Sequence, residues 1–265
     1  MKHSLRHQGF TLTEIAVVMI IVALLLGGML MPLSAQQDSR YRADTDTALN
    51  DIREALIGFA VVNGRLPCPA QATLAAGNAN AGVEATTGAG ATLSCACTNV
   101  TSDVAQSGGS ACPTADGSTV WGVLPWATLG LPEQDPWGNR YTYRVTNMFS
   151  RGPGQTTFGA TCTPSSNPTQ AGFALCTQGG ITVLTAAGST TLASTVPAIV
   201  IAHGKTGGGG YGTDGVQIAL SGTADEQENY DADATFVSNT TMDDQLRWIP
   251  LGLLMNRMLS AGKLP

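Results

Sequence analysis

The sequence predicts an α+β fold in which one long N-terminal spine helix packs on an antiparallel sheet, with disulfide-linked loops and a short C-terminal helix. Three observations predict it. A helical pattern extends over residues 11–62, short β-branched segments bounded by Gly, Asn or Asp follow in the second half, and an amphipathic segment ends the chain. With 265 residues, 43% of them hydrophobic, the chain is long enough to bury a core.

The first 31 residues carry most of the functional information. Residues 1–9, MKHSLRHQG, are short and basic, and they run through FTLTE into an apolar stretch from Ile15 to Met31. A secretory signal peptide instead places its cleavage site after the apolar region, and it does not normally carry an acid where Glu14 stands here. The order of these parts therefore indicates a different kind of leader.

This N-terminus resembles the class III leader of type IV prepilins and type II secretion pseudopilins. The resemblance implies that a prepilin peptidase cuts between Gly9 and Phe10 and methylates the new N-terminal Phe10. Glu14 then becomes the fifth residue of the mature chain, where the family keeps a glutamate that helps recruit the subunit into the filament. The implied partners are the prepilin peptidase, other pilin or pseudopilin subunits and an inner-membrane assembly platform.

Physical chemistry agrees with a role for Glu14 in assembly. An ionised carboxylate in hydrocarbon is costly unless it finds a partner. The free amine of Phe10 is the expected partner, either one helical turn away in the same chain or in a neighbouring subunit. The basic leader stays cytoplasmic, so we expect a single pass through the inner membrane with the head in the periplasm, followed by a pilus or pseudopilus that can reach the cell surface.

Two other interpretations of the N-terminus stay open. An ordinary single-pass anchor or uncleaved signal fits the 17 apolar residues, which span about 26 Å as a helix. A signal-peptidase cut after Ala35 is the other alternative. Neither explains the GFTLTE segment.

Beyond the apolar stretch the pattern becomes amphipathic. Leu49, Ile52, Leu56 and Phe59 recur at spacings of three and four, with charged residues between them. An Asn-Gly pair at residues 63–64 and two prolines soon after it form a strong stop signal.

This stop signal predicts one helix from Thr11 to Val62, about 78 Å long, which divides the chain into four parts. They are the leader peptide (1–9), a transmembrane and filament-core segment (10–33), the amphipathic half of the spine helix (34–63) and a globular extracytoplasmic head (64–265).

Six cysteines form an even set downstream of the apolar stretch, and an oxidising compartment favours disulfides for them. A metal site is the alternative, but the single Cys-Ala-Cys lacks a second close Cys or His pair. Of the fifteen pairings that six cysteines allow, Cys162 with Cys176 is the first we expect. The set comprises Cys68, Cys95, Cys97, Cys112, Cys162 and Cys176.

The head begins with a long connection and continues with short elements. Residues 70–120 are rich in small polar residues without a sustained period, which predicts a disulfide-pinned surface loop. Residues 124–145 then read as a short helix or turn, an Asp-Pro-Trp-Gly-Asn turn and a strand from Arg140 to Val145. This segment resembles the major pseudopilin motif, which implies that Trp137 and one tyrosine face pack on the spine helix.

Four further strands and a terminal helix complete the predicted head. The helix over residues 248–259 has Pro250 near its start and places Leu251, Leu254, Met255 and Met258 on one face. The predicted strands are Gly180 to Thr185, Val196 to Ala202, Val216 to Leu220 and Ala234 to Val237.

No catalytic constellation is visible in the sequence, so we predict that the chain is not an enzyme. His203 is the single histidine of the mature chain, and we interpret it as a loop residue hydrogen-bonded to backbone. The adjacent Gly-Lys-Thr at residues 204–206 lacks the glycine that a phosphate-binding loop needs five residues before its second glycine, because position 199 is Ile.

The charge balance argues against a nucleic-acid partner. The chain carries 13 basic and 19 acidic residues, and no Lys or Arg occurs between Arg65 and Arg140, so that stretch offers no basic patch for phosphates.

An acidic segment near the C-terminus offers the oxygen ligands that calcium prefers. Its Asp-Ala-Asp ending is similar to that of the C-terminal calcium loop of major pseudopilins, which implies a site at Asp225, Glu228, Asp231 and Asp233. The spacing before that ending departs from the family pattern, so a solvated acidic loop stays the alternative. The predicted fold itself requires no cofactor.

The sequence therefore predicts a structural subunit of a type IV pilus or related pseudopilus. The head of about 200 residues favours a minor, low-copy subunit, because a large head is harder to pack throughout a filament. The alternative is a single-pass, membrane-anchored periplasmic binding protein that does not polymerise. The sequence leaves open the choice between pilus and pseudopilus.

Overall fold

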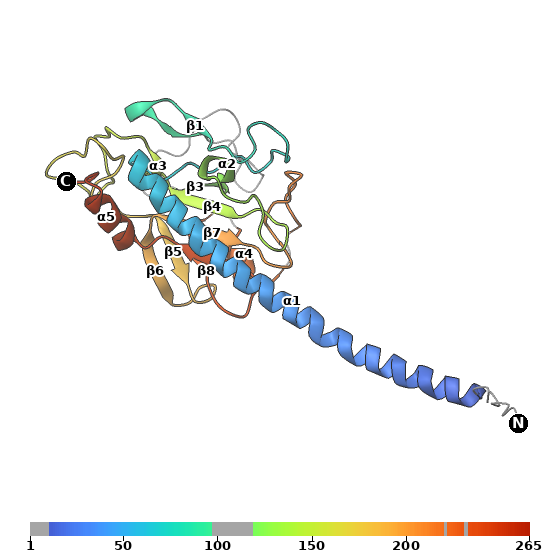
Figure 1. Ribbon diagram of the computed structural model, residues 1–265. Coiled ribbons are helices and arrows are strands. Elements are labelled where there is room, and N and C mark those ends of the chain that lie inside the picture. The colour runs from blue at the N-terminus through green and yellow to red at the C-terminus, as the bar shows by residue number, and fades with distance from the viewer. Residues whose placement is uncertain (1–10, 97–118, 220–221, 231–232) are drawn as a thin grey trace, which may run out of the picture. The chain divides into compact units, whose positions relative to one another are not determined.

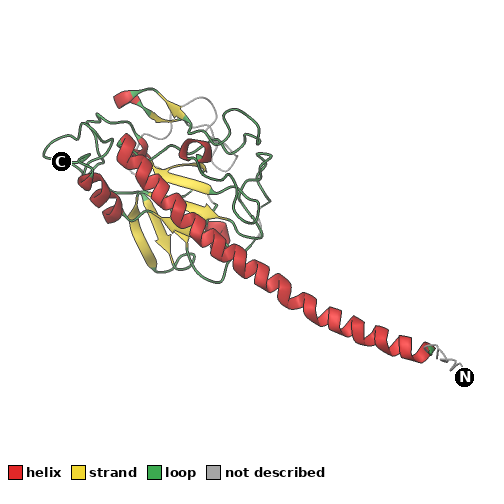
Figure 2. Cartoon of the chain, viewed as in Figure 1, coloured by secondary structure: helices red, strands yellow, loops and turns green. Residues whose placement is uncertain are grey.

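The computed structural model describes residues 11–96, 119–219, 222–230 and 233–265, without the side chains of residues 26–34. The chain forms two compact units, residues 1–43 and 44–265. Its longest element is helix α1 (Leu12–Asn63), which is a continuous helix of 52 residues, as Figures 1 and 2 show. The predicted helix from Thr11 to Val62 is confirmed.

Helix α1 ends where the sequence predicts a stop. Gly64 adopts a left-handed conformation with φ of 72°, and its N–H donates to the carbonyl of Ala60 over 2.8 Å. The Asn63 side-chain amide donates to the carbonyl of Phe59 over 3.0 Å. These two contacts satisfy carbonyls that the end of a helix otherwise leaves without donors.

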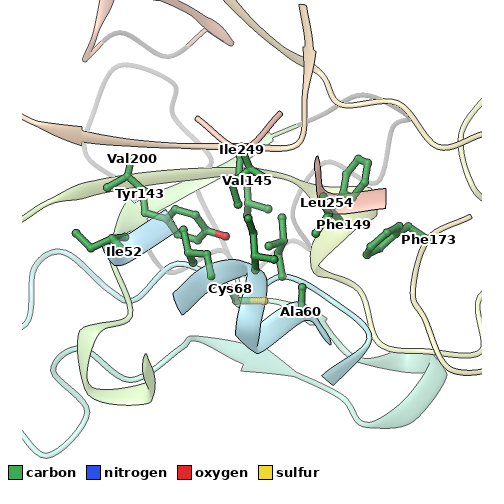
Figure 3. Packing of buried hydrophobic residues seen from close by; sticks show 14 of the residues in the cluster. Ile52, Ala60, Cys68, Tyr143, Val145, Phe149, Phe173, Val200, Ile249 and Leu254 are labelled. Carbon is green, nitrogen blue, oxygen red and sulfur yellow. The ribbon is translucent and has the colours of Figure 1, made fainter. Parts of the chain in front are cut away.

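A four-stranded antiparallel sheet lies at the centre of the second unit, in the order β3 (Thr119–Val123), β4 (Thr142–Thr146), β7 (Ala198–Ala202) and β9 (Gln245–Trp248). One face packs on the last turns of α1. Tyr143 and Val145 of β4 and Val200 of β7 belong to one buried cluster with Ile52 and Ala60 of the helix, as Figure 3 shows. Each fully buried aliphatic side chain of this kind contributes about 1.5–3 kcal/mol.

The C-terminal helix α5 (Leu251–Ser260) completes this core. Leu254, Met255 and Met258 are buried in the same cluster, and Leu251 packs against it, so the predicted apolar face is confirmed. Pro250 occupies the N-cap position, as the sequence indicates.

The opposite face of the four-stranded sheet packs on a second sheet. This sheet has the order β6 (Thr191–Val196), β5 (Ile181–Leu184) and β8 (Thr235–Val237). Ile199 and Ile201 of β7 form a buried cluster with Val183 and Phe236 from it. Alternate residues of β7 therefore face two different cores, as the period of a strand requires.

The four-stranded sheet confirms the predicted antiparallel sheet, and the second sheet adds one parallel pair, β5 with β8, that the sequence does not predict. A parallel pair needs a long crossover, and β6, β7 and the short helix α4 (Ala224–Glu228) lie between these two strands in the sequence. Hydrophobic alternation carries no information on strand direction.

Three of the four strands predicted in the second half are confirmed as β5, β7 and β8. The fourth, Val216 to Leu220, is wrong for the described residues 216–219, which form a single isolated bridge between Gln217 and Tyr211. The sequence analysis also missed β3, β6 and β9, the first of which begins inside the predicted loop. β6 is largely exposed and β9 carries Gln and Arg, so neither shows the apolar run of a buried strand.

The short elements around the central sheet follow the predicted order. The predicted short helix is α2 (Trp126–Leu129), and α3 (Asn147–Ser150) follows β4. Tyr141 and Tyr143 join the cluster on α1, which confirms the tyrosine face. Trp137 is partly exposed and is not a member of that cluster, which corrects its expected position.

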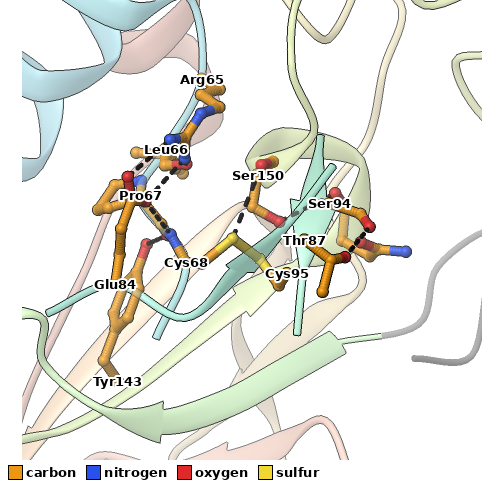
Figure 4. Close-up of a disulfide and its surroundings, with 11 residues drawn as sticks. Arg65, Leu66, Pro67, Cys68, Glu84, Thr87, Ser94, Cys95, Tyr143 and Ser150 are labelled. Atoms are coloured by element: carbon orange, nitrogen blue, oxygen red, sulfur yellow. Dashed lines mark hydrogen bonds and ion pairs between the residues drawn. A yellow bond between two sulfur atoms is a disulfide. The ribbon is translucent and has the colours of Figure 1, made fainter. Parts of the chain in front are cut away.

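A disulfide between Cys68 and Cys95 fastens the chain that leaves α1 to a small hairpin of β1 (Thr86–Thr87) and β2 (Ser94–Cys95), joined by the 3-10 turn η1 (Gly90–Thr92). Figure 4 shows an ion pair beside it, in which Arg65 contacts Glu84 over 2.7 Å. The same carboxylate accepts from the Cys68 N–H over 3.1 Å. The described part of the predicted loop 70–120, residues 70–96, is thus pinned, whereas residues 97–118 lie outside the described residues and residues 119–120 belong to β3.

The predicted bridge between Cys162 and Cys176 is confirmed. It closes a loop with a sequence separation of 14 residues. Cys97 and Cys112 lie outside the described residues, so their pairing stays a prediction.

The end of α1 generates a stability prediction. A Cβ on Gly64 would lie 2.0 Å from the carbonyl oxygen of Gln170, whereas a Cβ on Gly130, which ends α2 with a similar φ of 69°, would meet nothing within 4 Å. We expect Gly64→Ala to lower the free energy of unfolding by about 2–4 kcal/mol and Gly130→Ala by about 1 kcal/mol. Chemical denaturation of both variants checks this, and equal losses would contradict the clash.

Candidate functional site

Glu14 lies in the first turn of α1. Of the residues predicted for processing and assembly, it is the one that lies among the described residues. Its carboxylate accepts hydrogen bonds from the backbone N–H and the hydroxyl of Thr11, each over 3.0 Å. The Glu14 N–H in turn donates to the Thr11 hydroxyl over 3.3 Å. Thr11 and Glu14 therefore cap the first turn reciprocally.

The sequence analysis missed Thr11 as a partner of Glu14, although the signal is present. A Thr three residues before a Glu at the head of an apolar helix is the sequence pattern of such a cap. Gly9 and Phe10 lie outside the described residues, so the expected contact of Glu14 with the Phe10 amine stays a prediction.

The first turns of α1 expose large apolar side chains. Among them, Ile15 is 53% exposed, Met19 67% and Leu24 72%. Contiguous exposed apolar side chains of this kind are typical of a surface that a membrane or another protein covers. No helix in the part of the chain whose side chains are described is both long and apolar enough to cross a membrane.

Comparison with known families decides what this N-terminus is. The family described as the prokaryotic N-terminal methylation motif matches residues 4–30. The chain carries this methylation motif. It is the class III leader of type IV pilins and pseudopilins, and it supports a type IV pilin-like precursor. No curated protein and no solved structure gives a significant match, so the comparisons identify the leader and leave the head to its own geometry.

Two of the acidic residues expected to bind calcium, Asp225 and Asp233, have internal hydrogen-bond partners. The two carboxylate oxygens of Asp225 accept from the Ala187 N–H over 2.8 Å and from the Asn239 amide over 2.7 Å. Asp233 accepts from the Thr235 N–H over 2.6 Å. Glu228 ends α4, and Asp231 lies outside the described residues.

Among the residues that the structure describes, no group of three or more His, Cys, Asp or Glu side chains could hold a metal ion. Because Asp231 is not among them, the calcium site stays a prediction.

His203 is a loop residue, as predicted, but among the described residues its side chain makes polar contacts with other side chains and not with the backbone. The residue follows β7 and is 1% exposed. Its Nε2 lies 2.8 Å from the hydroxyl of Thr142 on the neighbouring strand, and its Nδ1 lies 3.6 Å from Asp244. The expected backbone partner is wrong, because the pairing of β4 with β7, which brings His203 beside Thr142, is not visible in the sequence.

A buried carboxylate, Asp135, lies in the Asp-Pro-Trp-Gly-Asn turn beside this region. One of its oxygens accepts from the backbone N–H groups of Trp137 and Asn139, each over 2.9 Å. Desolvation raises the pKa of Asp135 to about 6, against the opposing effects of these hydrogen bonds and of the nearby His203. Because the folded state then binds the proton more tightly than the unfolded chain, stability falls as the pH rises from about 4 to about 6.

This shift predicts a pH-dependent effect of Asp135→Asn. The amide oxygen can still accept from the turn, and the neutral side chain avoids the cost of a buried charge. We expect the variant to gain about 1–2 kcal/mol of stability at pH 8 and nothing at pH 3.5. Asp214→Asn, in which an exposed carboxylate accepts from the Val216 N–H over 3.0 Å, is the matched control. A gain that does not depend on pH in thermal unfolding would contradict the assignment.

Proposed function

We propose that this chain is a minor structural subunit of a type IV pilus or related pseudopilus. A prepilin peptidase cuts between Gly9 and Phe10 and methylates Phe10. The precursor waits in the inner membrane with residues 10–33 in the bilayer and its head in the periplasm. It then enters a filament through its N-terminal helix. The observation that carries the proposal is the methylation motif over residues 4–30.

The contacts of Glu14 support a role for its charge in assembly. A cap between Thr11 and Glu14 is worth about 1 kcal/mol, which is less than the several kcal/mol that an ionised carboxylate costs in hydrocarbon. A cationic partner would offset more of this cost than a hydroxyl and an amide N–H do. The free amine of Phe10, in the same chain or in a neighbouring subunit, is that partner.

The exposed apolar side chains around Ile15, Met19 and Leu24 support the same proposal. In the precursor lipid covers them, and in a filament the helices of neighbouring subunits cover them, so moving between the two environments costs little hydrophobic free energy. The subunit performs no chemistry and requires no cofactor or nucleic acid in this role, and its assembly partners are other pilins and an inner-membrane platform.

The alternative function is a membrane-anchored periplasmic binding protein that does not polymerise. It shares the apolar segment and the head with the proposed subunit. It differs in predicting no cleavage at Gly9 and no requirement for a charge at Glu14. Two measurements separate these functions.

Intact-mass and N-terminal analysis of the protein extracted from the membranes of its native host tests processing. We expect a mature chain that begins with N-methylated Phe10, because the motif places the cut after Gly9. A chain that begins at Met1 or at Gln36 would overturn the proposal and leave an anchored or secreted binding domain.

Substitution of Glu14 tests assembly. We expect Glu14→Ala and Glu14→Gln to reduce the subunit in sheared filaments by about tenfold or more, because only the ionised side chain attracts an amine. Glu14→Gln separates the two roles, since its amide oxygen can still cap Thr11. Asp51→Asn, at an exposed position of the same helix, is the control and should assemble normally. Normal assembly of Glu14→Gln would show that capping and not charge is required.

A further inference from the structure

Residues 170–173 lie against the end of α1, and we call this segment the clasp. The Gly172 N–H donates to the carbonyl of Gly64 over 2.9 Å. The two backbones meet so closely that a Cβ on Gly64 would lie 2.0 Å from the carbonyl oxygen of Gln170. The clasp therefore contacts the turn that ends α1.

Two buried side chains join the clasp to the core of the head. Ala171 and Phe173 belong to the buried cluster that contains Ala60 of α1. The ring centroids of Phe173 and Phe149 lie 4.7 Å apart, and Figure 3 shows the two rings side by side. Movement of the clasp away from α1 therefore exposes apolar surface and frees the end of the helix at the same time.

The rest of the chain around the clasp has no regular structure. From Arg151 to Gly180 the chain forms no helix or strand, and the structure describes all of this stretch. Connections of this length are uncommon in a compact domain and are usually functional. The disulfide between Cys162 and Cys176 closes a loop within the stretch, and the clasp lies inside that loop, just before Cys176. The bridge therefore limits how far the clasp can move from α1.

The two disulfides among the described residues differ in their access to solvent. Cys68 and Cys95 are both buried, whereas Cys176 is exposed and its partner Cys162 is buried. Thiol–disulfide exchange requires that a thiolate reach one sulfur of the bridge. A thiol in solution can therefore attack at Cys176, but it reaches the other bridge only after the head has opened.

A buried hydroxyl lies beside the sulfur that leaves in such an attack. The Thr177 hydroxyl accepts from the Ala174 N–H over 3.0 Å and lies 3.7 Å from Sγ of Cys162. A disulfide sulfur carries no proton, so the hydroxyl is the donor in this contact. Hydrogen bonds to charged acceptors are the stronger ones, so this hydroxyl stabilises a Cys162 thiolate more than it stabilises the bridged sulfur. Attack at Cys176 is therefore favoured on both grounds.

We propose that the bridge between Cys162 and Cys176 is a site of thiol–disulfide exchange, whose partner is a dithiol of the oxidoreductase class. The oxidised bridge holds the clasp on the end of α1, and reduction frees it. The inference rests on contacts within the head, and it holds whether or not the subunit enters a filament.

The exchange has two steps. A thiolate of the dithiol attacks Sγ of Cys176 and forms a mixed disulfide, while the electron pair of the old S–S bond goes to Sγ of Cys162, which then takes up a proton. The second thiolate of the dithiol attacks the dithiol's own sulfur in the mixed disulfide and releases the Cys176 thiolate, which is protonated in turn. The bridge becomes two thiols, and the dithiol becomes a disulfide.

Graded reduction of the full chain in detergent micelles tests the site, with dithiothreitol as the dithiol. Alkylation and peptide mapping then measure how fast each cysteine is released. We expect Cys162 and Cys176 to be alkylated about tenfold or more faster than Cys68 and Cys95, because only the first bridge has an exposed sulfur-bearing residue. Equal rates at the two bridges, or faster release of Cys68, would overturn the proposal.

Substitution of Thr177 tests the leaving group in the same assay. We expect Thr177→Val to slow the reduction of this bridge by about tenfold, because the Cys162 thiolate then leaves without a donor. Thr177→Ser keeps the hydroxyl and should restore the rate. Thr163→Val, at an exposed position of the same loop, is the matched control and should not change it. Thermal unfolding confirms that each variant is folded, and an unchanged rate in Thr177→Val would overturn the assignment.

Hydrogen exchange tests the release of the clasp. After selective reduction of this bridge in the wild-type chain, we expect amide exchange in residues 170–173 and 60–64 to rise by about tenfold or more, with residues 142–146 of the central sheet unchanged. The double variant Cys162→Ser, Cys176→Ser should show the same pattern without a reductant. Unchanged exchange in the clasp, or an equal rise throughout the head, would overturn the proposal.

Discussion

The packing of the last turns of α1 on the four-stranded sheet is the contact on which the rest of the head depends. Ile52 and Leu56 bury one face of α1 against Tyr143 and Val200. The helix ends soon after this contact, at Asn63, and the chain turns back into the head. Gly64 permits that end, because its left-handed backbone fits where a Cβ would strike the carbonyl of Gln170. The Arg65 ion pair with Glu84 and the Cys68 disulfide then fix the chain beyond the turn.

One helix has two kinds of surface because its two parts meet different surroundings. Around Leu49 and Leu56 the apolar side chains occupy one face and are fully buried by the head. Around Val18 and Leu24 apolar side chains occupy all faces and are more than half exposed, 57% and 72%. A single-sided pattern is what a protein core selects, whereas an all-round pattern suits lipid or a bundle of neighbouring helices. The second surface is consistent with the assembly role that we propose for the N-terminal helix.

The features that the sequence predicts well are local ones. Helical spacing and the Asn-Gly stop predict α1, and the short sequence separation favours the bridge between Cys162 and Cys176. The pattern T-L-T-E is that of the cap between Thr11 and Glu14. The failures are non-local. The parallel pairing of β5 with β8, the absence of a strand at residues 216–219 and the burial of His203 all depend on which segments meet across the sheet. No spacing in one sequence reports that.

The buried polar contacts around His203 depend on tertiary structure. Thr142, His203, Asn229 and Asp244 come from four segments, each of which looks unremarkable alone, and they meet because β4 pairs with β7. The methylation motif, in contrast, is read from residues 4–30 without any tertiary contact. In the proposed subunit, processing and assembly use the N-terminal segment, whereas the apolar face of the head on α1 serves its folding. The opposite face of the sheet is buried against the second sheet around Ile199 and Phe236, so it contributes to the stability of the head and not to the contact with α1.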